Sequence, residues 1–118
     1  MCLYIKKGYK RHRIAEKCIT VYKVVAYRSG IAKSKVQFFS YILGKTYKTT
    51  FRYDSSKSSI FDGFHAYLSL TEARMQRSNG YRVMECKIPK GAKYHIGEYN
   101  QIASDTIKPV RIIKLCAL

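Results

Sequence analysis

The chain has 118 residues, which corresponds to one domain with enough sequence to bury a core without disulfides. Its hydrophobic fraction of 47%, with 11 tyrosines and 5 phenylalanines, excludes a disordered chain. The 23 lysines and arginines against 7 acidic residues give a net charge of +16, a self-repulsion that binding to a polyanion would relieve.

The first 17 residues predict a basic N-terminal arm, which is mobile or forms a short frayed turn over residues 6–17. Residues 6–17 (KKGYKRHRIAEK) contain six lysines or arginines and one glutamate, and they show no usable apolar period. Charge is uneven along the chain, because residues 1–57 hold 14 basic and 2 acidic groups whereas residues 58–118 hold 9 and 5. We therefore expect the first half to attract a polyanion, and residues 18–118 to form a single α+β domain.

The next three segments predict strands. Residues 18–27 (CITVYKVVAY) and 36–43 (VQFFSYIL) are rich in β-branched and aromatic residues, which indicates central strands that are apolar on both faces. Residues 46–53 alternate instead between two faces. One face carries Tyr47, Thr49, Phe51 and Tyr53, and the other carries Thr46, Lys48, Thr50 and Arg52. This alternation predicts a half-buried strand with a basic outer face.

A helix is predicted over about residues 70–78. It follows a polar loop at residues 54–59 and extended structure over residues 60–68, with a turn at Asp62-Gly63. Ser69 and Glu72 fit a capping box, and Asn79-Gly80 supplies a stop signal. We expect Leu70 and Ala73 to face the sheet, with Met75 or Arg77 as further candidates.

Four strand-like segments follow the helix, at residues 81–88, 93–96, 101–104 and 109–115, with turns at residues 89–91 and 97–100. The chain as a whole therefore predicts an α+β fold, a small and mostly antiparallel sheet of six to eight short strands with one main helix.

The basic residues of the first half have the composition of a nucleic-acid-binding surface. Lysines and arginines release counterions from phosphates, and exposed tyrosines stack on unpaired bases. The candidate residues are Lys6, Lys7, Lys10, Arg11, Arg13, Lys17, Lys48 and Arg52, interleaved with Tyr9, Tyr22, Tyr27, Tyr41, Tyr47 and Tyr53. The alternative interpretation is that these tyrosines belong to the core and that the lysines keep the protein soluble.

Catalytic, metal and cofactor signals are weak. His12, His65 and His95 and the four cysteines lie at no metal-ligand spacing, and the chain has no P-loop, G-x-G-x-x-G or G-x-S-x-G motif. We predict no metal and no cofactor. His65 lies between Phe64 and Tyr67, so it is a core histidine on the apolar face, or a ligand or proton donor on the open face.

The cysteines and the N-terminal residues predict a cytoplasmic location. Cys2, Cys18, Cys86 and Cys116 are scattered singly, unlike those of secreted disulfide scaffolds, which favours a reducing compartment. The opening MCLYIKKGYKRHR holds neither the apolar region of a signal peptide nor a segment of about 20 apolar residues that would span a membrane. We expect no membrane association.

Three stretches, FFSYILGKTYK, DGFHAYLSLTEA and MECKIPKGAKYHIGEYNQIASDTI, together resemble small uncharacterised proteins of bacteriophages and their bacterial hosts. The resemblance covers roughly residues 20–113. It implies a phage or mobile-element setting and the cytoplasm of a bacterial host cell, and it carries no assigned activity.

A second resemblance is to the ADP-ribosyltransferase fold. It is carried by residues 27–30, residues 64–71, the turn at residues 88–92 and Glu98, which fall in a compatible order. It implies an enzyme that binds NAD or another nucleotide, with Arg28, His65 and Glu98 in its site. The chain lacks the Ser-Thr-Ser triplet and the paired glutamates of that family.

The prediction is therefore a phage-like accessory protein that works by binding, without catalytic residues. Its partner is nucleic acid or a nucleic-acid-handling protein, and an inhibitor of a host defence nuclease is one concrete form. Two alternatives remain, the transferase just described and a virion or assembly protein whose charge neutralises a packaged genome. The oligomeric state is not predicted.

Overall fold

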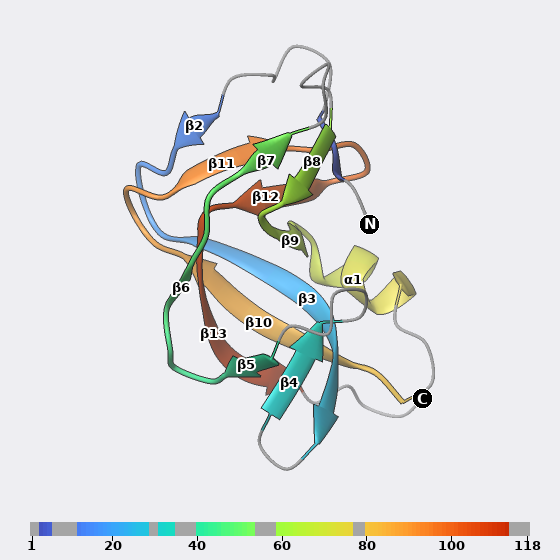
Figure 1. Ribbon diagram of the computed structural model, residues 1–118. Coiled ribbons are helices and arrows are strands. Elements are labelled where there is room, and N and C mark those ends of the chain that lie inside the picture. The colour runs from blue at the N-terminus through green and yellow to red at the C-terminus, as the bar shows by residue number, and fades with distance from the viewer. Residues whose placement is uncertain are drawn as a thin grey trace.

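The computed structural model describes residues 3–5, 12–28, 31–34, 40–53, 59–76 and 80–113. Thirteen strands and one helix lie in this part of the chain (Figure 1). The strands are β1 (Leu3–Tyr4), β2 (Arg13–Ile14), β3 (Ile19–Arg28), β4 (Ile31–Ser34), β5 (Ser40–Ile42), β6 (Tyr47–Lys48), β7 (Arg52–Tyr53), β8 (Ser59–Asp62), β9 (Phe64–Tyr67), β10 (Arg82–Ile88), β11 (Lys93–Ile96), β12 (Gln101–Ser104) and β13 (Thr106–Ile113), and the helix is α1 (Leu70–Gln76).

The strands form two antiparallel sheets. The larger sheet has the order β2-β11-β12-β9-β3-β10-β13-β6, with β4 beside β3 and β5 beside β4, and the smaller has the order β1-β8-β7. The predicted α+β class, mostly antiparallel with one helix, is confirmed. The expected six to eight strands is too low, because segments predicted as single strands are divided between sheets and the N-terminal residues add two more strands.

Strand β3 is central, as its sequence predicts. One edge pairs with β10 from Ile19 to Val25, and the other pairs with β9 at Tyr22 and with β4 beyond it. Val21 and Val25 are fully buried in the main core. The β-branched residues of this segment therefore form a strand that is enclosed on both edges.

Residues 46–53 do not form one strand. β6 pairs with β13 in the larger sheet, whereas β7 pairs with β8 in the smaller sheet. Between them, the Thr49 amide donates to the Asp105 carbonyl at 2.8 Å, which holds the chain where it changes sheet. The predicted alternation is otherwise visible, with Phe51 half-buried and Lys48 exposed, but Thr49 is exposed too.

The helix packs one face on the sheet. Ala73 is fully buried with Val24 and Val83, and Leu70 packs against them, as predicted. Met75 is 76% exposed and does not face the sheet. The Glu72 carboxylate accepts a hydrogen bond from the Asn100 amide at 2.5 Å, which links the helix to the β11–β12 turn.

Two parts of the segment predicted as a basic arm pair with the domain. β1 pairs with β8, and Ile5 bridges Gly97 with its own side chain buried. β2 pairs with β11, and Ala15 is 2% exposed in the main core. Residues 6–11, which hold most of the arm's charge, lie outside the described residues, so a mobile arm there stays a prediction.

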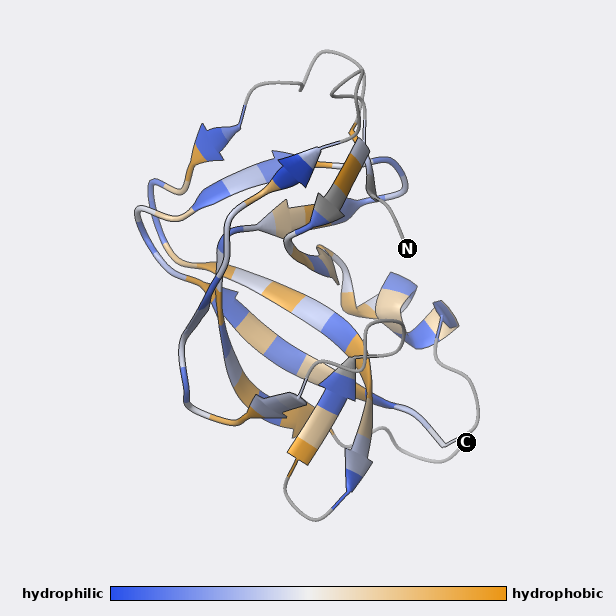
Figure 2. Ribbon diagram, in the orientation of Figure 1, coloured by the Kyte–Doolittle hydropathy of each residue, from blue (hydrophilic) through white to orange (hydrophobic). Residues whose placement is uncertain are grey.

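The main core lies on one face of the β3–β10–β13 region, and Figure 2 shows hydrophobic and hydrophilic residues alternating along β10. Met84, Cys86 and Ile88 of β10 are fully buried on the core face, so Glu85 and Lys87 lie on the opposite, outer face. Within the residues that the structure describes, no helix is long and apolar enough to cross a membrane.

Candidate nucleic-acid interface

Three lysines from three neighbouring strands share the outer face of the larger sheet. Lys87 of β10 lies directly opposite Lys108 of β13. Lys48 of β6 lies opposite Thr106, two residues from Lys108, and residues two apart in a strand project to the same face. Lys48 and Lys108 are exposed and Lys87 is half-buried. The registers therefore place three lysines on one face of neighbouring strands.

Three more lysines lie at the adjoining end of the sheet. The turn at residues 89–92 is hydrogen-bonded to Ala15, whose carbonyl accepts from the Gly91 amide and whose amide donates to the Ala92 carbonyl, both at 2.8 Å. This contact places Lys17 near Lys90. Lys93 follows the turn, and its carbonyl accepts from the Asp105 amide at 3.0 Å. We name the whole set the lysine edge: Lys17, Lys48, Lys87, Lys90, Lys93 and Lys108.

Few acids oppose this charge. Glu16 precedes Lys17 in the chain, Asp105 lies opposite Lys93, and Glu85 shares the outer face of β10 with Lys87, where Arg111 engages it. The Asp105 carboxylate accepts hydrogen bonds from the Lys93 amide and the Thr106 hydroxyl, both at 3.0 Å, so it also serves to hold the turn. Six lysines thus outnumber the carboxylates near them in chain or register, and like charges opposite one another on neighbouring strands, as at Lys87 and Lys108, are unfavourable. An anion at this edge would relieve the repulsion.

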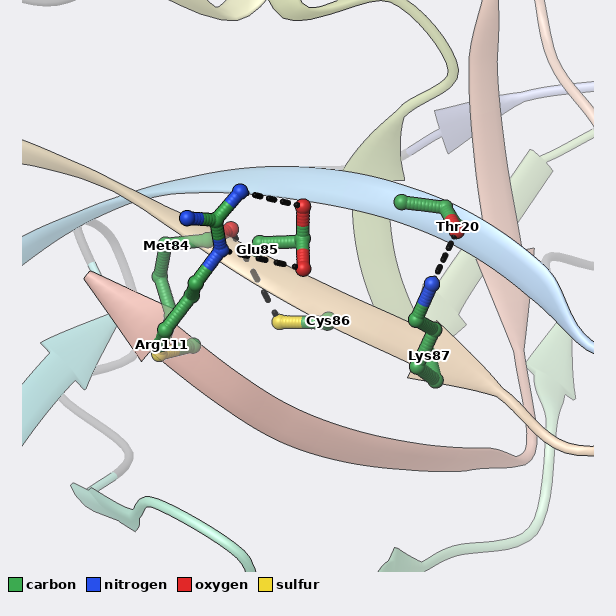
Figure 3. Close-up of polar contacts among 6 residues, drawn as sticks. All are labelled: Thr20, Met84, Glu85, Cys86, Lys87 and Arg111. Carbon is green, nitrogen blue, oxygen red and sulfur yellow. Dashed lines mark hydrogen bonds and ion pairs between the residues drawn. The ribbon is translucent and has the colours of Figure 1, made fainter. Parts of the chain in front are cut away.

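Neighbouring polar contacts fix part of the edge (Figure 3). The Lys87 ammonium donates to the Thr20 hydroxyl at 2.5 Å. Two residues before it on β10, Glu85 accepts from the Arg111 guanidinium at 3.3 Å, and these hydrogen bonds raise the pKa of Arg111. Glu85 therefore offsets the positive charge of Arg111.

The predicted nucleic-acid-binding residues divide into three groups. Lys17 and Lys48 belong to the lysine edge, and Arg13 is exposed on β2 opposite Tyr94, beside Lys93. Arg52 lies apart, on the smaller sheet, where Asp62 offsets its charge at 3.3 Å. The other candidates, Lys6, Lys7, Lys10 and Arg11, lie outside the described residues.

Four of the six lysines come from the second half of the chain, whereas the sequence-based prediction placed the binding surface mainly in the first half. They are Lys87, Lys90, Lys93 and Lys108. The predicted turn at residues 89–91 is the sequence signal that brings Lys87, Lys90 and Lys93 near one another. No sequence pattern indicates that Lys87 is opposite Lys108, because the register of β10 against β13 includes an irregularity between Glu85 and Cys86.

The tyrosines proposed for base stacking belong to the core instead. Tyr41 is 2% exposed, and the other described members of that set are half-buried and pack against core clusters: Tyr22, Tyr27, Tyr47 and Tyr53. Tyr9 lies outside the described residues. Two tyrosines that the sequence did not single out are exposed, Tyr4 at 65% and Tyr99 at 81%.

A second lysine feature lies inside the core. Lys23 is 9% exposed, its ammonium donates to the His65 carbonyl, and it lies 5.6 Å from the Tyr41 ring centroid. Burial lowers the pKa of Lys23 to about 8 and raises the pKa of the neighbouring Cys86 thiol to about 12. A thiol with so high a pKa is a poor nucleophile, so this cluster has no activated cysteine.

His65 has the character of a core histidine. Burial and the nearby Lys23 lower its pKa to about 4, so the ring is neutral at physiological pH. Its Nε2 atom is buried and has no hydrogen-bond partner among the described residues. The structure also keeps two residues of the transferase hypothesis, Arg28 and Glu98, apart. Arg28 ends β3 at the bottom of Figure 1, whereas Glu98 lies in the β11–β12 turn near the top.

One further polar pair joins the two sheets. The Tyr53 hydroxyl and His95 Nε2 lie 2.8 Å apart, with the Phe51 and His12 rings edge-on to the imidazole. His95 is 1% exposed. In the part of the chain that the structure describes, no group of three or more His, Cys, Asp or Glu side chains is arranged to hold a metal ion.

Comparisons with protein-family models, with curated proteins and with solved structures found no match to this chain.

Proposed function

We propose that the protein binds nucleic acid without reading its sequence, and that the lysine edge is the binding surface. The observation that carries the proposal is that Lys48, Lys87 and Lys108 share one face of three neighbouring strands, with Lys17, Lys90 and Lys93 around the adjoining turn. Neutralising phosphates with lysines releases condensed counterions, which supplies affinity for any sequence. The phage-like setting suggested by the sequence is compatible with such an accessory protein.

The lysine edge has the chemistry of a phosphate-binding surface. A lysine ammonium is a mobile point charge, and it lacks the planar fork with which arginine reads a guanine edge. Arg111, on the outer face of β13, is already engaged by Glu85. Contacts of this kind hold the nucleic acid in position and carry no sequence information.

A salt titration tests the proposal. Binding of labelled duplex DNA is measured by fluorescence anisotropy over a range of salt concentrations, for the wild type and for the double variant Lys48→Gln/Lys108→Gln. Each lost phosphate contact lowers the slope of log affinity against log salt by about 0.9. Because the double variant loses two contacts, we expect the magnitude of its slope to be smaller than that of the wild type by about 1.8.

A matched control removes two positive charges elsewhere. Lys33→Gln/Arg74→Gln changes exposed side chains of β4 and α1, which lie outside the lysine edge. It should leave the slope close to that of the wild type. Equal slopes for both double variants would remove the lysine edge from the proposal, and binding to an acidic protein in place of DNA would transfer the function to a protein partner.

A further inference from the structure

The β11–β12 hairpin has Lys93 of the lysine edge at its open end and two exposed tyrosines, Tyr99 in its turn and Tyr4 beside it, at its closed end. Lys93 begins β11, and Asp105 follows β12. At the closed end, the Glu98 amide donates to the Tyr4 carbonyl at 3.0 Å, and Ile5 bridges Gly97. Tyr4 and the turn residue Tyr99 are therefore neighbours.

Both tyrosine rings project into solvent. Tyr99 is 81% exposed and Tyr4 is 65% exposed. Ile5 is buried beside Tyr4, and since side chains alternate along a strand, the ring of Tyr4 points away from the core. An exposed phenol ring offers a flat aromatic face to any base that is not already stacked in a duplex.

The turn holds Tyr99 in an unfavourable conformation. Tyr99 and Asn100 both have positive φ angles, 58° and 56°, in a tight turn closed by a hydrogen bond from the Gln101 amide to the Glu98 carbonyl at 3.3 Å. Such turns favour glycine, asparagine and aspartate. A tyrosine persists in this conformation only where its surroundings hold it there.

The surroundings do hold the turn on both sides. The Leu68 amide donates to the Asn100 carbonyl at 2.9 Å, and the Asn100 side chain donates to Glu72 of helix α1 at 2.5 Å. Gly97 also donates to the Gln101 carbonyl at 2.8 Å. The ring of Tyr99 is therefore presented on a fixed support, which reduces the ordering cost of binding.

We propose that Tyr4 and Tyr99 form a stacking platform for unpaired bases, so that the nucleic acid bound at the lysine edge is single-stranded. This inference rests on the proposed function. A single strand that contacts the lysines reaches the platform along β11, whose strand length is about 10 Å from Lys93 to Ile96. A duplex has no free base faces for the two rings.

Glu98 lies beside the platform and carries a negative charge there. Its effect on phosphates is short-ranged, because at physiological ionic strength exposed charges are screened over about 8 Å. The phosphates are held at the lysine edge, at the other end of the hairpin. Glu98 therefore repels a backbone phosphate at the platform. The flat faces of the bases, which carry no net charge, are then the part of the strand that contacts the two rings.

The test compares single strands with duplexes. Anisotropy titrations use oligothymidine, oligouridine and duplex DNA of equal length with the wild type and with Tyr4→Ala, Tyr99→Ala and the double variant. Stacking of one base corresponds to a loss of about 5- to 150-fold on truncation to alanine. We expect losses of that size on the single strands and no more than about a twofold change on duplex DNA.

Two controls keep the result interpretable. Tyr4→Phe/Tyr99→Phe retains both rings and should bind single strands like the wild type. Met75→Ala truncates another exposed apolar side chain, on α1, and should change nothing. Equal losses on single strands and duplexes, or no loss on either, would overturn the stacking platform. The salt slope on duplex DNA tests the lysine edge separately, so the two proposals can fail independently. The oligothymidine and oligouridine arms show which sugar is preferred.

Discussion

Lys23 is a cation in a place where the sheet otherwise buries apolar side chains. It lies between Val21 and Val25 on the core face of β3, opposite Met84 of β10. Its ammonium has the His65 carbonyl and the face of the Tyr41 ring as partners, and no carboxylate pairs with it among the described residues. Burial without a counter-charge is the reason that its pKa falls to about 8.

Replacing Lys23 with methionine should stabilise the protein at neutral pH. A pKa lowered from 10.5 to about 8 corresponds to about 3 kcal/mol of unfavourable burial of the charged form. That cost is fully present below pH 8 and disappears as the pH rises from about 8 toward 10.5, because the folded protein then loses the proton before the unfolded chain does. Urea unfolding of Lys23→Met should give a free energy of unfolding higher by about 1–3 kcal/mol at pH 7.

The advantage of Lys23→Met over the wild type should shrink on going from pH 7 to pH 10. Lys33→Met, at an exposed position of β4, serves as the matched control and should show no such change. A less stable Lys23→Met variant would show that the ammonium stabilises the core through its two contacts. An advantage that is constant with pH would show that burial does not lower the pKa of Lys23.

At the scale of elements, the smaller sheet is attached to the larger one through few groups. Ile5, Ile60 and Ala103 are buried between the two sheets, with Phe51 and Tyr53 at the margin. The hydrogen bond between Tyr53 of β7 and His95 of β11 crosses the same boundary. This polar contact fixes how β7 lies against β11.

Tyr53→Phe should destabilise the protein by about 1–3 kcal/mol, because His95 is 1% exposed and its Nε2 atom would lose the phenol as a partner. Thermal or urea unfolding measures the change. Tyr4→Phe removes a phenol hydroxyl from an exposed residue and should cost less than about 0.5 kcal/mol. Equal effects of the two substitutions would mean that the hydroxyl of Tyr53 contributes nothing to the attachment of the smaller sheet.

Local patterns in the sequence predicted the elements better than their pairing. The β-branched run of β3, the start of α1 at Leu70 and the turn at Gly63 correspond to observed features, whereas residues 77–79, where the helix was predicted to stop, lie outside the described residues. The change of sheet between Lys48 and Arg52 was missed, because alternation looks the same whether or not the partner strand changes. The lysine edge was missed in part for the same reason, since Lys87 meets Lys108 through a long-range pairing.

At the scale of the whole molecule, a charge of +16 is held within a radius of gyration of 13.6 Å. The Debye length is about 30 Å at 0.01 M ionic strength and about 8 Å at 0.15 M. In dilute buffer, therefore, the charges on opposite sides of the molecule repel one another, whereas at physiological ionic strength only neighbouring charges do. In the lysine edge, the like-charged residues Lys87 and Lys108 lie directly opposite each other on neighbouring strands.

The thermal midpoint should accordingly rise when salt is raised from about 0.01 to 0.15 M, as screening removes repulsion from the folded state. Lys48→Gln/Lys108→Gln should unfold at a higher temperature than the wild type in the dilute buffer. Like charges that face each other across strands cost up to about 1 kcal/mol, which is several degrees in a domain of this size. The difference in thermal midpoint between this variant and the wild type should decrease as salt is added. The control Lys33→Gln/Arg74→Gln should show a smaller difference in the dilute buffer. A midpoint that falls as salt is added would mean that attractive ion pairs outweigh the net repulsion, and the edge would then have no electrostatic cost for a bound phosphate to relieve.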